Sequence, residues 1–189
     1  MGAGLSAVTG ASSAAAKPCQ LVVRRQEGPS EFLRFMLEGL EVGQQVVALA
    51  GAGCLTELAR SLGDSGFPPQ ILLRSGKLVF LTAPDCLGQL SHRDGPFHRS
   101  SLRRQAPIVR WVSDWSWAYS NDRPASLLLD YQRRVHHLVR SLEALSLCTV
   151  HSRCLERRTL LAVLADHRQA VRGLAPATRE MFPAIGLPQ

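Results

Sequence analysis

Two kinds of hydrophobic pattern alternate along the chain. Short runs with the composition of strands fall at residues 20–24, 45–50, 78–81, 108–113, 145–150 and 169–172. The run at 45–50 is nearly all apolar, as expected for a strand buried on both faces. Between them, apolar residues recur every three or four positions, which indicates helices; these segments run from 29 or 30 to 43, from 55 to 63, from 124 to 142 and from 155 to 167. Strands that alternate with helices predict an α/β fold of three layers, in which a mostly parallel sheet is flanked by helices on both sides.

The stretch between the third and fourth predicted strands follows neither pattern. Residues 82–95 are expected to form mostly loop, and residues 100–105 are expected to form a brief helix. Elsewhere Gly51-Ala52-Gly53 is expected to turn the chain, and Leu72 and Leu73 are expected to form a short helical turn.

The chain has the length of a single domain. Its 189 residues, of which 46% are hydrophobic, can bury a sizeable core, and we place this α/β domain at residues 18–173. Residues 1–17 are small and predict a disordered tail, and residues 174–189, which are rich in proline, predict an irregular one. No basic segment precedes an apolar core at the N-terminus, and no apolar run reaches about 18 residues. We therefore expect a cytoplasmic protein without a membrane partner.

Positive charge is spread along the chain. The formal net charge is +7, and because only Lys17 and Lys77 are lysines, 20 of the 22 basic residues are arginines. An excess of arginine is found in proteins that bind phosphate or nucleic acid. Here the arginines are scattered over several segments rather than gathered on one helix face, and this pattern disfavours nucleic acid as a partner.

The cysteines and histidines do not form a motif. The five cysteines are an odd number and most lie in apolar segments, which is typical of reduced, buried thiols. Cys148, His151 and Cys154 lie close in sequence, but their spacing across a strand and the start of a helix does not converge readily on zinc. His136 and His137 point about 100° apart on a helix and are poor joint ligands. The sequence therefore predicts no metal site.

A carboxylate follows the fourth predicted strand. The strand over 108–113 is followed at once by Asp114, and ligands of open α/β sheets bind at the carboxyl ends of strands. In a phosphate-binding fold, a carboxylate at this point holds a metal or polarises a water molecule. The alternative is that Asp114 caps the loop that follows the strand.

Three tryptophans surround this carboxylate in sequence. Trp111, Trp115 and Trp117 alternate along the strand and its exit, and they point to one face if the extended conformation continues. Two interpretations remain open: core packing beneath a helix, or the aromatic wall of a pocket for a small apolar ligand. In the second interpretation, Tyr119 adds a polar group to the pocket.

The phosphate-binding loop of an ATPase is missing. Such a loop needs glycines and a lysine after a strand, because backbone N–H groups and the lysine bind the phosphates. The first strand is followed by Arg25-Gln26-Glu27-Gly28-Pro29-Ser30, which has one glycine and no lysine. We expect no ATP hydrolysis and no catalytic residue. A weakened nucleotide site would use the helix start at Ser30 together with Arg24 or Arg25.

Several segments in serial order resemble the MEDS family, the sensory domain named after methanogens, methylotrophs and the regulator DcmR. They cover roughly residues 19–172 and are Phe32–Val46, Ser75–Thr82, Ser113–Ala118, Leu129–Gln132, Leu147-Cys148 and Arg157-Arg158. The resemblance implies a trimmed relative of the RecA-like ATPase module of KaiC. Two positions depart from the family pattern, because the family usually carries Gly-Glu-Met-Ser-Trp over the span 113–117 and a glutamate in place of Gln132. These departures put any activity inherited through those glutamates in doubt.

The resemblance implies a sensory or regulatory domain without catalytic activity or cofactor. We expect it to bind a small ligand or a protein partner near Asp114, Trp115 and Trp117, and to signal by protein contact in bacterial signal transduction or transcription control. The expected partner is a kinase, an anti-sigma factor or a transcription regulator. Two alternatives are a nucleotide-binding protein with a degenerate phosphate loop and a structural subunit that forms a homo-oligomer.

Overall fold

The computed structural model describes residues 19–24, 30–88, 108–120, 125–153 and 167. Five strands form one sheet, in which every neighbouring pair is parallel and the order is β1-β5-β4-β2-β3. Their bounds are Gln20–Arg24 for β1, Gln45–Ala50 for β2, Leu78–Thr82 for β3, Val109–Asp114 for β4 and Leu145–His151 for β5. The α-helices are α1 (Ser30–Glu41), α2 (Ala52–Asp64), α3 (Pro69–Arg74), α4 (Ala83–Gly88) and α5 (Ala125–Ser141), and the 3-10 helix η1 spans Ser116–Ser120.

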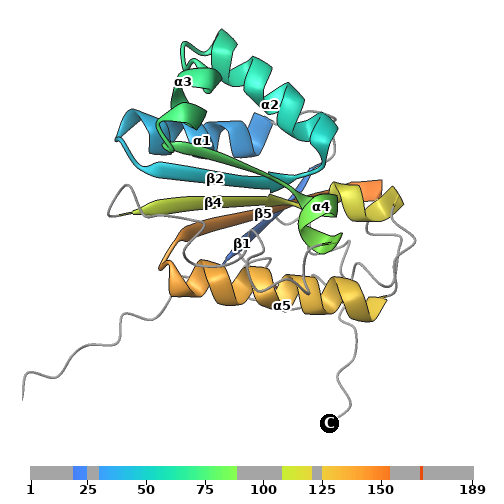
Figure 1. Ribbon diagram of the computed structural model, residues 1–189. Helices are drawn as coiled ribbons and strands as arrows, with labels where there is room; N and C mark the ends of the chain where they lie inside the picture. Colours follow the sequence, from blue (N-terminus) through green and yellow to red (C-terminus); the bar gives the residue numbers. More distant parts are fainter. Residues whose placement is uncertain (1–18, 25–29, 89–107, 121–124, 154–166, 168–189) are drawn as a thin grey trace, which may run out of the picture.

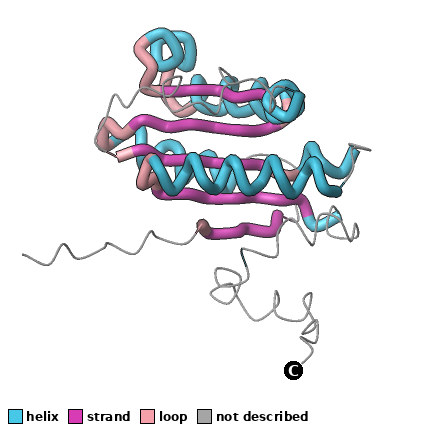
Figure 2. The backbone as a smooth tube through the Cα atoms, turned by 60° about the horizontal axis from the view of Figure 1, so that its bottom comes forward, coloured by secondary structure: helices cyan, strands magenta, loops and turns pink. Residues whose placement is uncertain are grey.

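Helices cover both faces of the sheet, so the three-layer α/β architecture predicted from the sequence is confirmed (Figures 1 and 2). On one side, which we call the α1 face, buried residues of α1 and α2 pack on β2, and α3 lies beyond them. On the other side, the α5 face, residues of α5 and α4 pack on β4 and β5. Within the described ranges, no helix is long and apolar enough to cross a lipid bilayer.

In the segment after β3, residues 83–88 were wrongly expected to be loop, and the rest of that segment lies outside the described residues. The segment begins with α4, where Pro84 suits the first turn of a helix and Asp85 places an acidic side chain there. Ala83 and Cys86 are buried on the α5 face, so packing fixes a helix too short to show a period. The predicted helix at 100–105, the tails 1–17 and 174–189, the strand at 169–172 and all of the helix at 155–167 except His167 lie outside the described residues.

At the amino ends of the strands, which we call the amino edge of the sheet, α1 packs closely against β4. Arg110 of β4 donates hydrogen bonds to the Gln44 side chain (2.6 Å) and to the backbone oxygen of Phe35 (2.8 Å). Its guanidinium also lies over the Phe35 ring, 4.7 Å from the centroid. The arginine passes so close to α1 that a Cβ atom on Gly39 would lie 2.6 Å from Arg110 Cδ. A side chain at position 39 would therefore displace Arg110.

The helices α1 and α5 end in the same way. After α1, the Gly43 N–H donates to Leu40 O and the next N–H donates to Gly39 O. After α5, Glu143 and Ala144 repeat both hydrogen bonds. This pattern is a Schellman motif, which places one residue in the left-handed region. That residue has φ 73° at Gly43 and φ 51° at Glu143.

Candidate functional site

The crossover helices change sides between β2 and β4. The chain leaves β2 through α2 on the α1 face, and it leaves β4 through η1 and α5 on the opposite face. These two strands are neighbours in the sheet. In open α/β sheets, ligands bind at such a topological switch point, outside the carboxyl ends of the two strands. The candidate site is therefore the place where β2 ends at Ala50 and β4 ends at Asp114.

Asp114 joins the end of β4 to β5 and to η1. The residue is buried, and its Oδ1 atom accepts hydrogen bonds from Ser116 Oγ (2.9 Å) and Thr149 Oγ1 (3.0 Å). The Ser116 hydroxyl in turn accepts a hydrogen bond from the backbone N–H of His151 (3.0 Å). This geometry corresponds to the capping alternative for Asp114. It also places a carboxylate and two hydroxyl groups side by side at the switch point.

An aromatic cluster lies against this network on the α5 face. The rings of Trp115 and Trp117 are stacked, with centroids 6.4 Å apart, and both meet Tyr131 of α5 edge-on at 5.8 and 5.6 Å. Trp115 and Tyr131 are fully buried, and Trp117 is half-buried. Burial raises the pKa of the Tyr131 hydroxyl above its ordinary value. The partly exposed Trp117 is therefore the ring that a ligand could reach.

The prediction that the three tryptophans share one face is consistent with this arrangement, although the chain after Asp114 is not extended. η1 begins at Ser116, yet Trp117 still packs with Trp111 and Trp115 in the core of the α5 face. Trp111 is buried, and its indole N–H donates to Ser113 Oγ at 2.8 Å. Core packing therefore accounts for Trp111 and Trp115.

Gly51 is a member of the site that the sequence predicted only as a turn. A Cβ atom on Gly51 would lie 3.3 Å from Trp117 Cβ, so the tryptophan packs closely against the backbone that leaves β2. Gly51 also caps α2, whose first turn has neither a side-chain cap nor an acidic residue. A glycine directly after a buried strand was the available signal. We call Gly51, Asp114, Trp115, Trp117 and Tyr131 the switch-point site.

Gln132, one of the two departures from the family pattern, lies beside this site on α5. Its side chain is buried, and its Nε2 atom has no hydrogen-bond partner in the described part of the chain.

The other predicted site residues lie on β1, α1 and η1 or outside the described residues. Arg24 ends β1 and Ser30 begins α1, but β1 is an edge strand two places from β4. Two strand spacings amount to about 10 Å. Tyr119 belongs to η1, and Arg25 lies outside the described residues.

The topological switch point lies at the carboxyl end of β2. A phosphate-binding loop would therefore be expected directly after β2 rather than after β1. The residues there, Gly51-Ala52-Gly53-Cys54, contain no lysine, so this loop also lacks the pattern needed to bind phosphates.

Comparisons with known proteins identify a family and similar solved structures. The family model described as "MEDS: MEthanogen/methylotroph, DcmR Sensory domain" matches residues 18–168. No curated protein matches the chain. Among solved structures, the flagellar accessory protein FlaH from Methanocaldococcus jannaschii is similar, with 12% sequence identity and a TM-score of 0.47 over 78% of this chain and 67% of FlaH.

Proposed function

The chain belongs to the MEDS family of methanogen/methylotroph, DcmR sensory domains, and from this premise we propose that it binds a small ligand at the switch-point site and passes the signal to another protein by contact. The observation that carries the sensory role is the family match over residues 18–168. The location of the ligand is argued from the switch between β2 and β4.

The chemistry of the switch-point site favours a small, largely apolar ligand with one polar group. The half-buried ring of Trp117 offers an aromatic surface. The half-buried hydroxyl group of Ser116, which donates a hydrogen bond to Asp114, lies at the start of η1 and can orient a polar group.

The signal has a direct path from this site to the surface of α5. η1 carries Trp117 and is tied to β5 through Ser116 and His151, and Trp117 contacts Tyr131 of α5. The outer side of α5 exposes Arg133, Arg134 and Arg140. A ligand that moves η1 would therefore move α5, whose basic side suits an acidic surface on a kinase, an anti-sigma factor or a transcription regulator.

Intrinsic fluorescence tests the ligand site directly, because all three tryptophans of the chain lie on β4 and η1 or between them. We expect a ligand from a panel of small apolar compounds to change the emission and to raise Tm. At about 100 times its Kd it should stabilise the fold by about 2.7 kcal/mol. The variant Trp117→Ala should lose both effects, and Val42→Ala, a change at an exposed apolar residue of the amino edge, should retain them. Equal stabilisation of Trp117→Ala and the unchanged chain would contradict the proposed location.

A nucleotide is the second candidate ligand. It is favoured by the amino end of α2, which has no side-chain cap at the switch-point site and therefore offers backbone N–H groups to an anion. Mg-ATP, Mg-ADP and Mg-GTP belong in the same panel. A magnesium-dependent rise in Tm that is lost in Asp114→Asn would make this chain a nucleotide sensor, and the absence of such a rise would leave the apolar ligand.

A further inference from the structure

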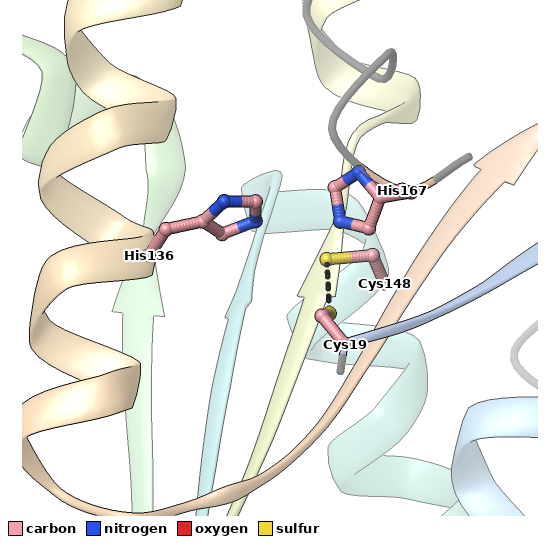
Figure 3. A group of neighbouring side chains, drawn as sticks. All are labelled: Cys19, His136, Cys148 and His167. Atoms are coloured by element: carbon pink, nitrogen blue, oxygen red, sulfur yellow. Dashed lines mark hydrogen bonds between the residues drawn. The ribbon is translucent and has the colours of Figure 1, made fainter. Parts of the chain in front are cut away.

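Two cysteines and two histidines meet beneath α5, one strand over from the end of β4 (Figure 3). Cys19 lies just before β1, Cys148 lies in β5, His136 reaches in from α5, and His167 approaches from the opposite side. One potential ligand atom of each residue lies within 4.8 Å of those of the other three. We call these four residues the thiol–imidazole cluster.

The parallel pairing of β1 with β5 brings the sulfur atoms together. Leu21 is paired with Cys148, and side chains two residues apart on a strand share a face. Cys19 and Cys148 therefore both point toward α5, with their Sγ atoms 3.1 Å apart. The imidazole rings of His136 and His167 complete the group, with centroids 4.9 Å apart.

His167 has unmet bonding capacity in the interior. Its side chain is 2% exposed, and neither ring nitrogen has a well-formed hydrogen bond to a described residue. A buried polar group without a well-formed hydrogen bond destabilises the folded chain. A metal ion that binds one of these nitrogens would remove that destabilisation.

We propose that Cys19, His136, Cys148 and His167 bind one zinc ion. Two thiolates and two imidazoles form the donor set that zinc binds tetrahedrally. With Zn–S bonds of about 2.3 Å, the two sulfur atoms of such a site lie about 3.8 Å apart, so they need to separate by only a few tenths of an ångström each. The sulfur atoms bind as thiolates, and the protons that they hold pass to solvent.

The first test is metal content. The 189-residue chain, produced with zinc in the medium and purified without a metal-binding tag, should contain about one zinc per molecule by mass spectrometry of the digested protein. Cys148→Ser and His136→Ala should lose the zinc. The matched controls Cys54→Ser in α2 and His137→Ala, the exposed neighbour of His136, should keep it.

A second test does not depend on the stability of the variants. The unchanged chain, freed of metal by a chelator and titrated with Co²⁺, should show the intense visible bands of a tetrahedral site and a thiolate charge-transfer band, both complete at one equivalent. A weak octahedral spectrum, zinc retained by Cys148→Ser, or a Cys19–Cys148 disulfide in place of metal in the purified chain would overturn the proposal.

Discussion

At the scale of single residues, the sulfur atoms of Cys19 and Cys148 lie only 3.1 Å apart, so the charge of one thiol influences the other. The hydrogen bond from Cys148, together with His167, lowers the pKa of Cys19 from 9.0 to about 4. A group whose pKa is lower in the folded chain adds stability that is fully present above its unfolded pKa. That contribution declines as the pH falls from about 9 toward about 4.

The metal-free chain should therefore lose more stability between pH 7.5 and pH 5 than its Cys19→Ser variant does. Urea unfolding at the two pH values measures the difference. Cys86→Ser is the control, since burial and then Asp85 raise the pKa of Cys86 to about 11, so this thiol stays protonated at both values. An identical loss in the unchanged chain and in Cys19→Ser would show that Cys19 does not ionise in the folded state.

The side chain of Arg110 passes close to Gly39 and restricts the size of the residue at that position. The variant Gly39→Ala places a methyl group 2.6 Å from Arg110 Cδ, so Arg110 must leave its hydrogen bonds with Gln44 and Phe35. Overpacking of this kind costs about 1–3 kcal/mol, and urea unfolding should show a net destabilisation. Gly53→Ala is the matched control, because its Cβ meets nothing within 4 Å; it should be neutral or stabilising by up to about 1 kcal/mol. Equal effects of the two variants would mean that Arg110 is free to move aside.

At the scale of elements, the carboxyl ends of α1 and α5 can be compared directly, because both helices end in a Schellman motif. Both helices end in a left-handed residue, which is glycine at position 43 and glutamate at position 143. A side chain in this region costs roughly 1 kcal/mol. Gly43→Ala should therefore destabilise the chain by about 1 kcal/mol, and Glu143→Gly should stabilise it by a similar amount. Thermal unfolding measures both, and a loss of Tm in Glu143→Gly would show that the contacts of the glutamate side chain outweigh its backbone strain.

The sequence predicted the longer elements well because their patterns are local. The apolar run over 45–50 coincides with β2, and the helical stripe that begins after Pro124 is α5. The prediction was wrong over 83–88, because α4 has only six residues and is held by the burial of Ala83 and Cys86 rather than by a repeated pattern. Similarly, η1 interrupts the extended chain just after Asp114.

At the scale of the whole molecule, strand order decides which residues meet, and no local pattern contains that order. Asp114, Trp115 and Trp117 could be grouped because they are contiguous. Gly51 could not be added, since its contact with Trp117 depends on the pairing of β2 with β4. Cys19 and Cys148 are 129 residues apart and meet only because β1 adds to the sheet beside β5.

The NMR resonances of the tryptophan indole N–H groups give the most direct test of the ligand site. A ¹H–¹⁵N spectrum resolves the three indole N–H groups, and Trp117→Phe identifies the resonance of Trp117. A compound that raises Tm should move the Trp117 resonance most, and it should leave the amides of Gly76 and Lys77, at the opposite edge of the sheet, in place. A compound that raises Tm while the Trp117 resonance stays fixed would contradict a ligand site at the junction of β2 and β4.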